Sequence, residues 1–242
     1  ETGPPGLRRI ALEHAFTTAA PGRAARARAL LADPDEGVRC VAAAALLLDA
    51  PDDPAARAVL TATLSPDAAI GALAMLRQAT GRDIAAILRT IGAHPDPAVR
   101  AAALAAAENS AAGDRGLLDW AEQAAADPVP DVRRAALALR VRLTPAARLD
   151  DITARFLGDP SPEVRHAGAQ ALAALGAAAV PAICRQLHSA REEAQIAAID
   201  ALGAALGPAA GERLLAELRD GVFARIGANR RLTRARPAET EI

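Results

Sequence analysis

Aromatic residues and lysine are scarce or missing in this chain of 242 residues. There is no tyrosine and no lysine, and the four aromatic residues are Phe16, Trp120, Phe156 and Phe223. Hydrophobic residues still make up 52% of the sequence, enough for a sizeable core, so the interior must consist of Ala, Leu, Val and Ile. Ala and Leu are strong helix formers, whereas sheet proteins draw on β-branched and aromatic residues. The composition therefore predicts an all-α protein.

An excess of one charge, a cysteine framework and long apolar runs are missing as well. The formal net charge of −1 gives no overall attraction to nucleic acid or anionic membranes. Cys40 and Cys184 are too few for a disulfide framework, so we expect two free, mostly buried thiols. No uncharged apolar run reaches 18 residues and the N-terminus has no signal-peptide pattern, so no segment is predicted to span a bilayer.

One sequence motif occurs four times along the chain. It consists of an acidic or histidine start, prolines, Val-Arg and an Ala-Leu run. The copies are DPDEGVRCVAAAALLL, HPDPAVRAAALAAAE, DPVPDVRRAALALR and DPSPEVRHAGAQALAALG, which begin at Asp33, His94, Asp127 and Asp159. The last three valines lie 33 and 32 residues apart, and a gap of 61 residues precedes them. Periods of this size are typical of a solenoid.

Two weaker copies complete the series. SPDAAIGALAMLRQ begins at Ser65 and fills the gap with Pro66 and Ile70 in register, and SAREEAQIAAIDALGAAL begins at Ser189. Each copy predicts a helix with one apolar face, and a second amphipathic helix precedes it, as in LDDITARFLGD from Leu149. Acidic residues and prolines at the starts, such as Asp96 and Pro97, are typical of a helix N-cap and first turn.

On these motifs the chain resembles HEAT-repeat proteins, in particular the short-repeat kind of bilin-lyase-like HEAT domains. The resemblance covers about residues 21–206. It implies that the Asp and Arg of the motif form a ladder between adjacent repeats and that the second helix of each repeat lines a concave surface. His94 departs from the Asp position. The ladder residues implied in this way are Asp33, Arg39, Arg100, Asp127, Arg133, Asp159 and Arg165.

The predicted fold is thus a right-handed α-solenoid of about six to seven HEAT-like helix pairs. Residues 4–20 are expected to form an N-terminal capping helix and residues 233–242 a flexible tail. The approximate repeats are 21–50, 51–79, 80–109, 110–143, 144–176, 177–206 and 207–232. Residues 1–3, Glu-Thr-Gly, resemble the remnant of a secretion expression vector. A cytoplasmic location is favoured, and an extracytoplasmic one stays open if that remnant reflects native secretion.

No catalytic, cofactor or metal site is predicted. The four histidines, His14, His94, His166 and His188, form no HExxH motif and no i, i+4 pair. Neither cysteine has a nearby histidine, and there is no Gly-rich phosphate loop or GxSxG motif. A single tryptophan, Trp120, offers too little for base stacking, so nucleic acid is an unlikely partner. The sequence thus argues against an enzyme.

The second helices provide the best candidate interaction surface. Counting from the Val of Val-Arg as zero, positions +2, +5, +6 and +9 are predicted to face outward on the concave side, and an apolar groove with sparse polar groups suits a helix or peptide. We therefore expect a scaffold that binds a protein or peptide partner, or another domain of its parent chain. Two alternatives stay open: a bilin-lyase-like enzyme or ligand carrier, and a basic C-terminal segment, RDGVFARIGANRRLTRAR, that contacts anionic lipid or nucleic acid. The candidate residues are Glu108, Arg134, His166 and Gln170.

Overall fold

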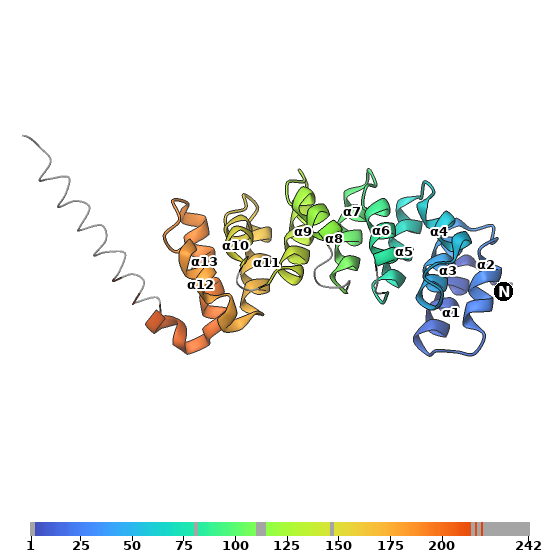
Figure 1. Ribbon diagram of the computed structural model, residues 1–242, viewed down its shortest axis with the longest axis horizontal. Helices are drawn as coiled ribbons and strands as arrows, with labels where there is room; N and C mark the ends of the chain where they lie inside the picture. The colour runs from blue at the N-terminus through green and yellow to red at the C-terminus, as the bar shows by residue number, and fades with distance from the viewer. Residues whose placement is uncertain are drawn as a thin grey trace, which may run out of the picture. The chain divides into compact units, whose positions relative to one another are not determined.

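The computed structural model describes residues 3–79, 82–109, 115–145 and 148–213, together with 216 and 219. These residues are helical or lie in turns, and they include no strand. The chain divides into two compact units, residues 1–145 and 146–242, which are described separately below. In both units short antiparallel helices follow one another in pairs (Figure 1), as the sequence predicts for an α-solenoid.

The first unit holds α1 to α9. After α1 the helices form pairs: the first helix of a pair is α2, α4, α6 or α8, and the second helix is α3, α5, α7 or α9. The second helices pack on one another in chain order, α3 on α5, α5 on α7 and α7 on α9. Helix α1 packs on α3 in the same way, so it lies in the layer of second helices. The bounds are α1 Pro5–Thr17, α2 Arg23–Leu30, α3 Glu36–Asp49, α4 Pro54–Thr61, α5 Pro66–Leu76, α6 Arg82–Ile91, α7 Pro97–Ala106, α8 Arg115–Ala124 and α9 Pro130–Leu143.

The second unit repeats this plan with fewer helices. Second helix α11 packs on second helix α13, while first helix α10 contacts both α11 and α12. The bounds are α10 Asp150–Leu157, α11 Pro162–Ala173, α12 Val180–Gln186 and α13 Glu192–Leu206. Most of the expected seventh repeat, and the whole tail, lie outside the described residues.

The starts of the second helices follow the predicted N-cap chemistry. The Asp35 carboxylate accepts a hydrogen bond from the Val38 amide at 2.9 Å, and the Asp96 carboxylate accepts one from Ala98 at 2.8 Å. Proline occupies the first turn of α5, α7, α9 and α11, where its missing N–H costs nothing. Local sequence thus sets where each second helix begins.

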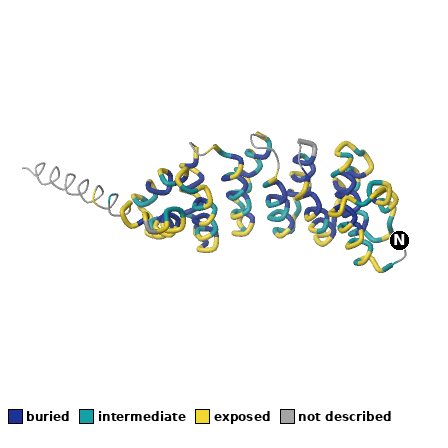
Figure 2. The backbone as a smooth tube through the Cα atoms, turned by 90° about the horizontal axis from the view of Figure 1, so that it is seen from below, coloured by how far each residue is buried: buried dark blue, intermediate teal, exposed yellow. Residues whose placement is uncertain are grey.

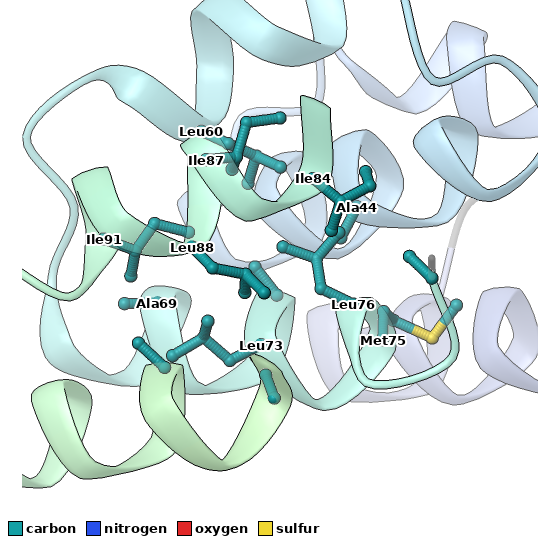
Figure 3. Packing of buried hydrophobic residues seen from close by; sticks show 14 of the residues in the cluster. Ala44, Leu60, Ala69, Leu73, Met75, Leu76, Ile84, Ile87, Leu88 and Ile91 are labelled. Atoms are coloured by element: carbon teal, nitrogen blue, oxygen red, sulfur yellow. The ribbon is translucent and has the colours of Figure 1, made fainter. Parts of the chain in front are cut away.

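The core is made of alanine and leucine, with buried positions on the facing sides of the helices and exposed ones at the turns (Figure 2). Leu60, Leu73 and Leu88 lie among the labelled side chains that fill the space between α4, α5 and α6 (Figure 3). Helix α3 is enclosed almost completely, with every residue from 40 to 47 at most 1% exposed, because α1, α2, α4 and α5 all pack against it. Small alanine side chains allow this close approach of helices.

One close approach needs glycine. A Cβ added to Gly168 on α11 would lie 2.6 Å from the ring of Phe156 on α10, closer than carbon atoms pack. The ring of Phe156 on the first helix therefore packs against a position of α11 that has no side chain. Phe156 is fully buried.

The weak second copy has a different register from the one predicted. Pro66 begins α5 as Pro97 begins α7, so Ala68 rather than Ile70 takes the place of the motif valine. Ala68 is 2% exposed and Ile70 is 41% exposed. The prediction for Ile70 was wrong because the larger side chain was preferred over the distance from the proline.

Candidate interaction surface

The motif arginine closes the turn of its own repeat. Nη1 of Arg39 donates to the carbonyl oxygens of Asp33 and Pro34 at 2.7 and 2.9 Å, six and five residues earlier. Arg100, Arg133 and Arg165 make the same pair of bonds in their own turns. These bonds satisfy carbonyl groups that the turn leaves without helical partners.

The motif aspartate accepts a backbone hydrogen bond within the same turn. The Asp33 carboxylate accepts from the Asp35 amide at 2.9 Å, and Asp127 and Asp159 accept from the amides two residues after them at 2.9 and 2.8 Å. Acid and arginine are therefore both needed within one repeat. Their fixed spacing in the sequence reflects this local arrangement as well as any contact between repeats.

Contacts between repeats use the same groups. Arg100 forms a bidentate ion pair with Asp127 of the next repeat, with Nε and Nη2 at 2.9 and 3.1 Å from the carboxylate oxygens. Burial raises the pKa of Asp127, but hydrogen bonds from Arg100 and the Val129 amide outweigh it, so the pKa lies below its usual value. Between α3 and α5, Glu36 instead accepts from the amide and hydroxyl of Ser65 at 3.0 and 2.6 Å.

His94 replaces the aspartate with an imidazole ring. Its Nδ1 accepts from the Asp96 amide at 3.0 Å, and its Nε2 lies 3.1 Å from the Leu64 carbonyl oxygen of the preceding repeat. These partners assign the tautomer with hydrogen on Nε2. One ring nitrogen thus performs the turn role of the aspartate and the other contacts the neighbouring repeat, while Asp96 serves as the N-cap.

Two further residues take the arginine role, and the sequence motif did not reveal them. Gln195 donates to the Ser189 carbonyl oxygen, six residues earlier, at 2.7 Å, and the Ser189 hydroxyl accepts from the Arg191 amide at 3.2 Å. On α1, Arg8 donates to the Gly3 carbonyl oxygen and pairs with Asp33 of the next repeat at 2.7 Å. The only signal was their position in the period, since neither follows a valine.

The solvent-facing side of the second helices, here called the second-helix surface, is the side that the sequence predicts as concave. Positions +2 and +6 are accessible from α5 onward, whereas position +5 is buried at Leu73, Leu104, Leu137 and Ala169. The prediction that +5 faces outward was therefore wrong, except at Ile199, which is 45% exposed. A projection of one helix alone does not show that neighbouring helices cover position +5. The residues at +2 are Ile70, Ala101, Arg134, His166 and Ile196.

The candidate residues fall into two patches, one in each unit. In the second unit His166 and Gln170 are both exposed, and Gln170 Nε2 lies 2.9 Å from His166 Nε2. In the first unit Arg134 is exposed on α9 and pairs with Asp131 at 3.0 Å. Glu108 is half-buried in the short helix Ala107–Asn109 that follows α7. The structure thus brings His166 and Gln170 together.

Two grooves of the first unit are lined by residues of the turns and of the first helices. A groove of about 520 Å³ is lined by Trp120, Arg89 and Asp119, with the Arg100 and Asp127 ion pair at its side. A second groove of about 520 Å³ contains His94. The ion pair satisfies its own charges, so neither of its members is an obvious general acid or base.

The described ranges include no cluster of three or more His, Cys, Asp or Glu side chains able to hold a metal ion. Cys40 and Cys184 are buried and not joined by a disulfide. Burial raises the pKa of Cys40 to about 11, so its thiol stays protonated at neutral pH and is a poor nucleophile. No helix in the part that the structure describes is both long and apolar enough to cross a membrane.

The stacked helix pairs, with their repeated turns, define an α-solenoid protein. Residues 149–228 match the family model of HEAT repeats, and this match supports a HEAT-repeat family. A comparison with curated proteins and one with solved structures each find no match. The family is therefore supported by the repeat itself, and the resemblance to the bilin-lyase-like kind stays a prediction.

Proposed function

We propose that this protein is a non-catalytic scaffold that binds a protein or peptide partner through its second-helix surface, with Arg134 in one patch and His166 with Gln170 in another. HEAT repeats are helical scaffolds that typically mediate interactions. The partner is a separate protein or another domain of the parent chain.

The observation that carries the proposal is an exposed isoleucine at position +2 of a second helix in each unit. Ile70 and Ile196 are 41% and 53% exposed, whereas Ala68 and Ala194, which stand at position 0 two residues earlier, are 2% and 1% exposed. Alanines at +2 and +6 of α7 leave the backbone open to close approach. A helix or extended peptide with apolar side chains suits such a surface, and Arg134, His166 and Gln170 supply the polar contacts that fix its position.

The test is a pull-down from lysate and membrane fractions of the source organism, with partners identified by mass spectrometry. Arg134→Glu alone, and His166→Glu with Gln170→Glu, separate the two patches. We expect one protein that the wild type retains and at least one variant loses. Each variant is first checked for unchanged helicity and thermal stability.

A matched control is Arg155→Glu, because Arg155 is exposed on first helix α10, outside the second-helix surface. Equal recovery by the wild type and both patch variants would contradict the assigned surface. Loss with the Arg155 variant alone would place the interaction on the first helices instead.

A further inference from the structure

Helix α1 exposes a face that is covered in the other second helices that the structure describes. Arg8 bonds to the carbonyl oxygen five residues earlier and to the next repeat's aspartate, as Arg100 does, so Arg8 is position +1 and Leu7 is position 0. The residues at 0, +3, +4 and +7 are then Leu7, Ile10, Ala11 and His14, and all four are exposed. Leu7 is 61% and Ile10 60% exposed.

In the six other second helices, position 0 is at most 2% exposed and position +4 is buried. In α3, α7, α9 and α13 both the first helix of the same repeat and the preceding second helix pack on the second helix, and in α11 the first helix α10 does so. Helix α1 contacts α2 and α3, which both follow it, and these cover its opposite side through Leu12, Ala15 and Phe16. The residues at position 0 are Val38, Ala68, Val99, Val132, Val164 and Ala194, and those at position +4 are Ala42, Ala72, Ala103, Ala136, Gly168 and Ala198.

The second unit shows what such a face accepts. Phe156 of α10 lies against Gly168, which is position +4 of α11. The corresponding residue of α1 is Ala11, and it lines a cavity of about 280 Å³ together with Leu12, Ala15 and Leu30. A bulky apolar side chain from a docked helix would find there a small residue at +4 and an apolar wall.

Charge points to the same kind of occupant. In the second unit Arg185 of α12 pairs with Asp150 on α10, the first helix before it. In the first unit Arg26 of α2 is exposed at the rim of the cavity, and it has no ion pair among the residues that the structure describes. Three other arginines of α1 and α2 are paired: Arg8 with Asp33, Arg23 with Asp49 and Arg28 with Asp53. A carboxylate on the occupant would complement Arg26.

We propose that the Leu7, Ile10, Ala11 and His14 face of α1 docks an amphipathic helix of a partner protein, one with large apolar residues four positions apart and a carboxylate near the first of them. The docked helix takes the place that a first helix has in the other repeats. This surface is separate from the second-helix surface, and it is continuous with the packing that already joins the repeats.

A peptide with the sequence of residues 148–159 is the probe, because α10 carries Ile152, Phe156 and Asp150 in this arrangement. Short helices are marginal in water, so the peptide is stapled through its positions 151 and 155, which face solvent in α10. Fluorescence anisotropy with the labelled peptide and the full chain measures binding. We expect saturable binding that the double variant L7D/I10D weakens by about tenfold or more.

Three comparisons decide the result. Ile70→Asp, also an exposed isoleucine on a second helix, and Arg134→Glu should bind the peptide as the wild type does. Arg26→Glu should weaken binding, and a peptide with Asp150→Arg should restore it. A peptide with Phe156→Asp should not bind. Equal binding by L7D/I10D, or none by the wild type, would overturn the proposal.

Sedimentation of the wild type and L7D/I10D tests a different occupant. A monomer in both cases agrees with a partner helix. A wild-type dimer that L7D/I10D converts to a monomer would mean that a second copy covers α1, and this would overturn docking of a partner. Loss of lysate partners with the Arg134 or His166 and Gln170 variants does not bear on this result, so the two proposals fail separately.

Discussion

The Arg100 guanidinium joins two turns at once. Its Nη1 donates to the Pro95 carbonyl oxygen at 2.7 Å, and its Nε and Nη2 hold the Asp127 carboxylate of the next repeat at 2.9 and 3.1 Å. We expect Arg100→Ala to lower the free energy of unfolding by about 2 kcal/mol, because it leaves Asp127 and two carbonyl groups with fewer partners. Urea unfolding followed by circular dichroism measures the change. Arg134→Ala is the control, since its exposed pair with Asp131 should change stability by less than about 0.5 kcal/mol.

The ladder also predicts a pH dependence. Hydrogen bonds from Arg8 lower the pKa of Asp33, and the pKa of Asp127 is lowered as well despite its burial. Both carboxyl groups therefore bind protons more weakly in the folded state than in the unfolded chain. Their stabilising contribution is present above the unfolded pKa, about 3.9, and is lost as the pH falls through the folded values. Unfolding free energies between pH 7 and pH 2 should fall at the acid end, and less so in Asp127→Asn; an equal fall would contradict the assignment.

Two glycines in second helices should respond in opposite ways to alanine. Gly168→Ala places a Cβ against the Phe156 ring and should lower the unfolding free energy by about 1 to 3 kcal/mol through overpacking. Gly203 on α13 has no atom near its added Cβ, so Gly203→Ala should raise stability by about 0.5 to 1 kcal/mol through helix propensity. Thermal unfolding of both variants measures the difference. No loss of stability in Gly168→Ala would argue against the packing of α10 on α11.

A buried hydroxyl on α10 gives a third stability test. Thr153 is fully buried, and its Oγ1 has no hydrogen-bond partner within the described part of the chain. Thr153→Val keeps the shape and removes the unsatisfied polar atom, so it should raise the unfolding free energy by about 1 kcal/mol. Thr153→Ala serves as the comparison, because it removes the same atom and also leaves a void. A Val variant less stable than the wild type would mean that the hydroxyl has a partner.

The thiols should be slow to react in the folded protein. Burial raises the pKa of Cys40 to about 11, and Cys184 is buried too. Reaction with a disulfide reagent at pH 8 should modify neither residue quickly, while two thiols per chain react at once in guanidinium chloride. Rapid modification of the native protein would show that α3 opens, and Cys40→Ala identifies which thiol reacted.

The sequence predicted the repeat, the helix pairs and the N-caps because proline, aspartate and alanine act locally. Position +5 was misplaced because its burial comes from the packing of neighbouring helices, which one helix projected alone cannot show. Ile70 was misplaced because it is larger than Ala68, although only Ala68 has the correct distance from Pro66. The α1 surface was missed because Leu7 and Ile10 read as an ordinary capping helix, and only the bonds of Arg8 to Gly3 and Asp33 set its register.

In the four clear copies of the motif the turn is closed by the arginine of its own repeat together with an aspartate or, at His94, an imidazole of that repeat. Such a repeat carries the side chains that shape its own turn. The joints between repeats are less uniform: an arginine with an aspartate, a glutamate with a serine, and a histidine with a carbonyl group all serve. Duplication or loss of one 32- or 33-residue segment in the gene would then require only that a new joint form. The length of such a protein can change by whole segments during evolution, while each segment is free to acquire its own surface residues.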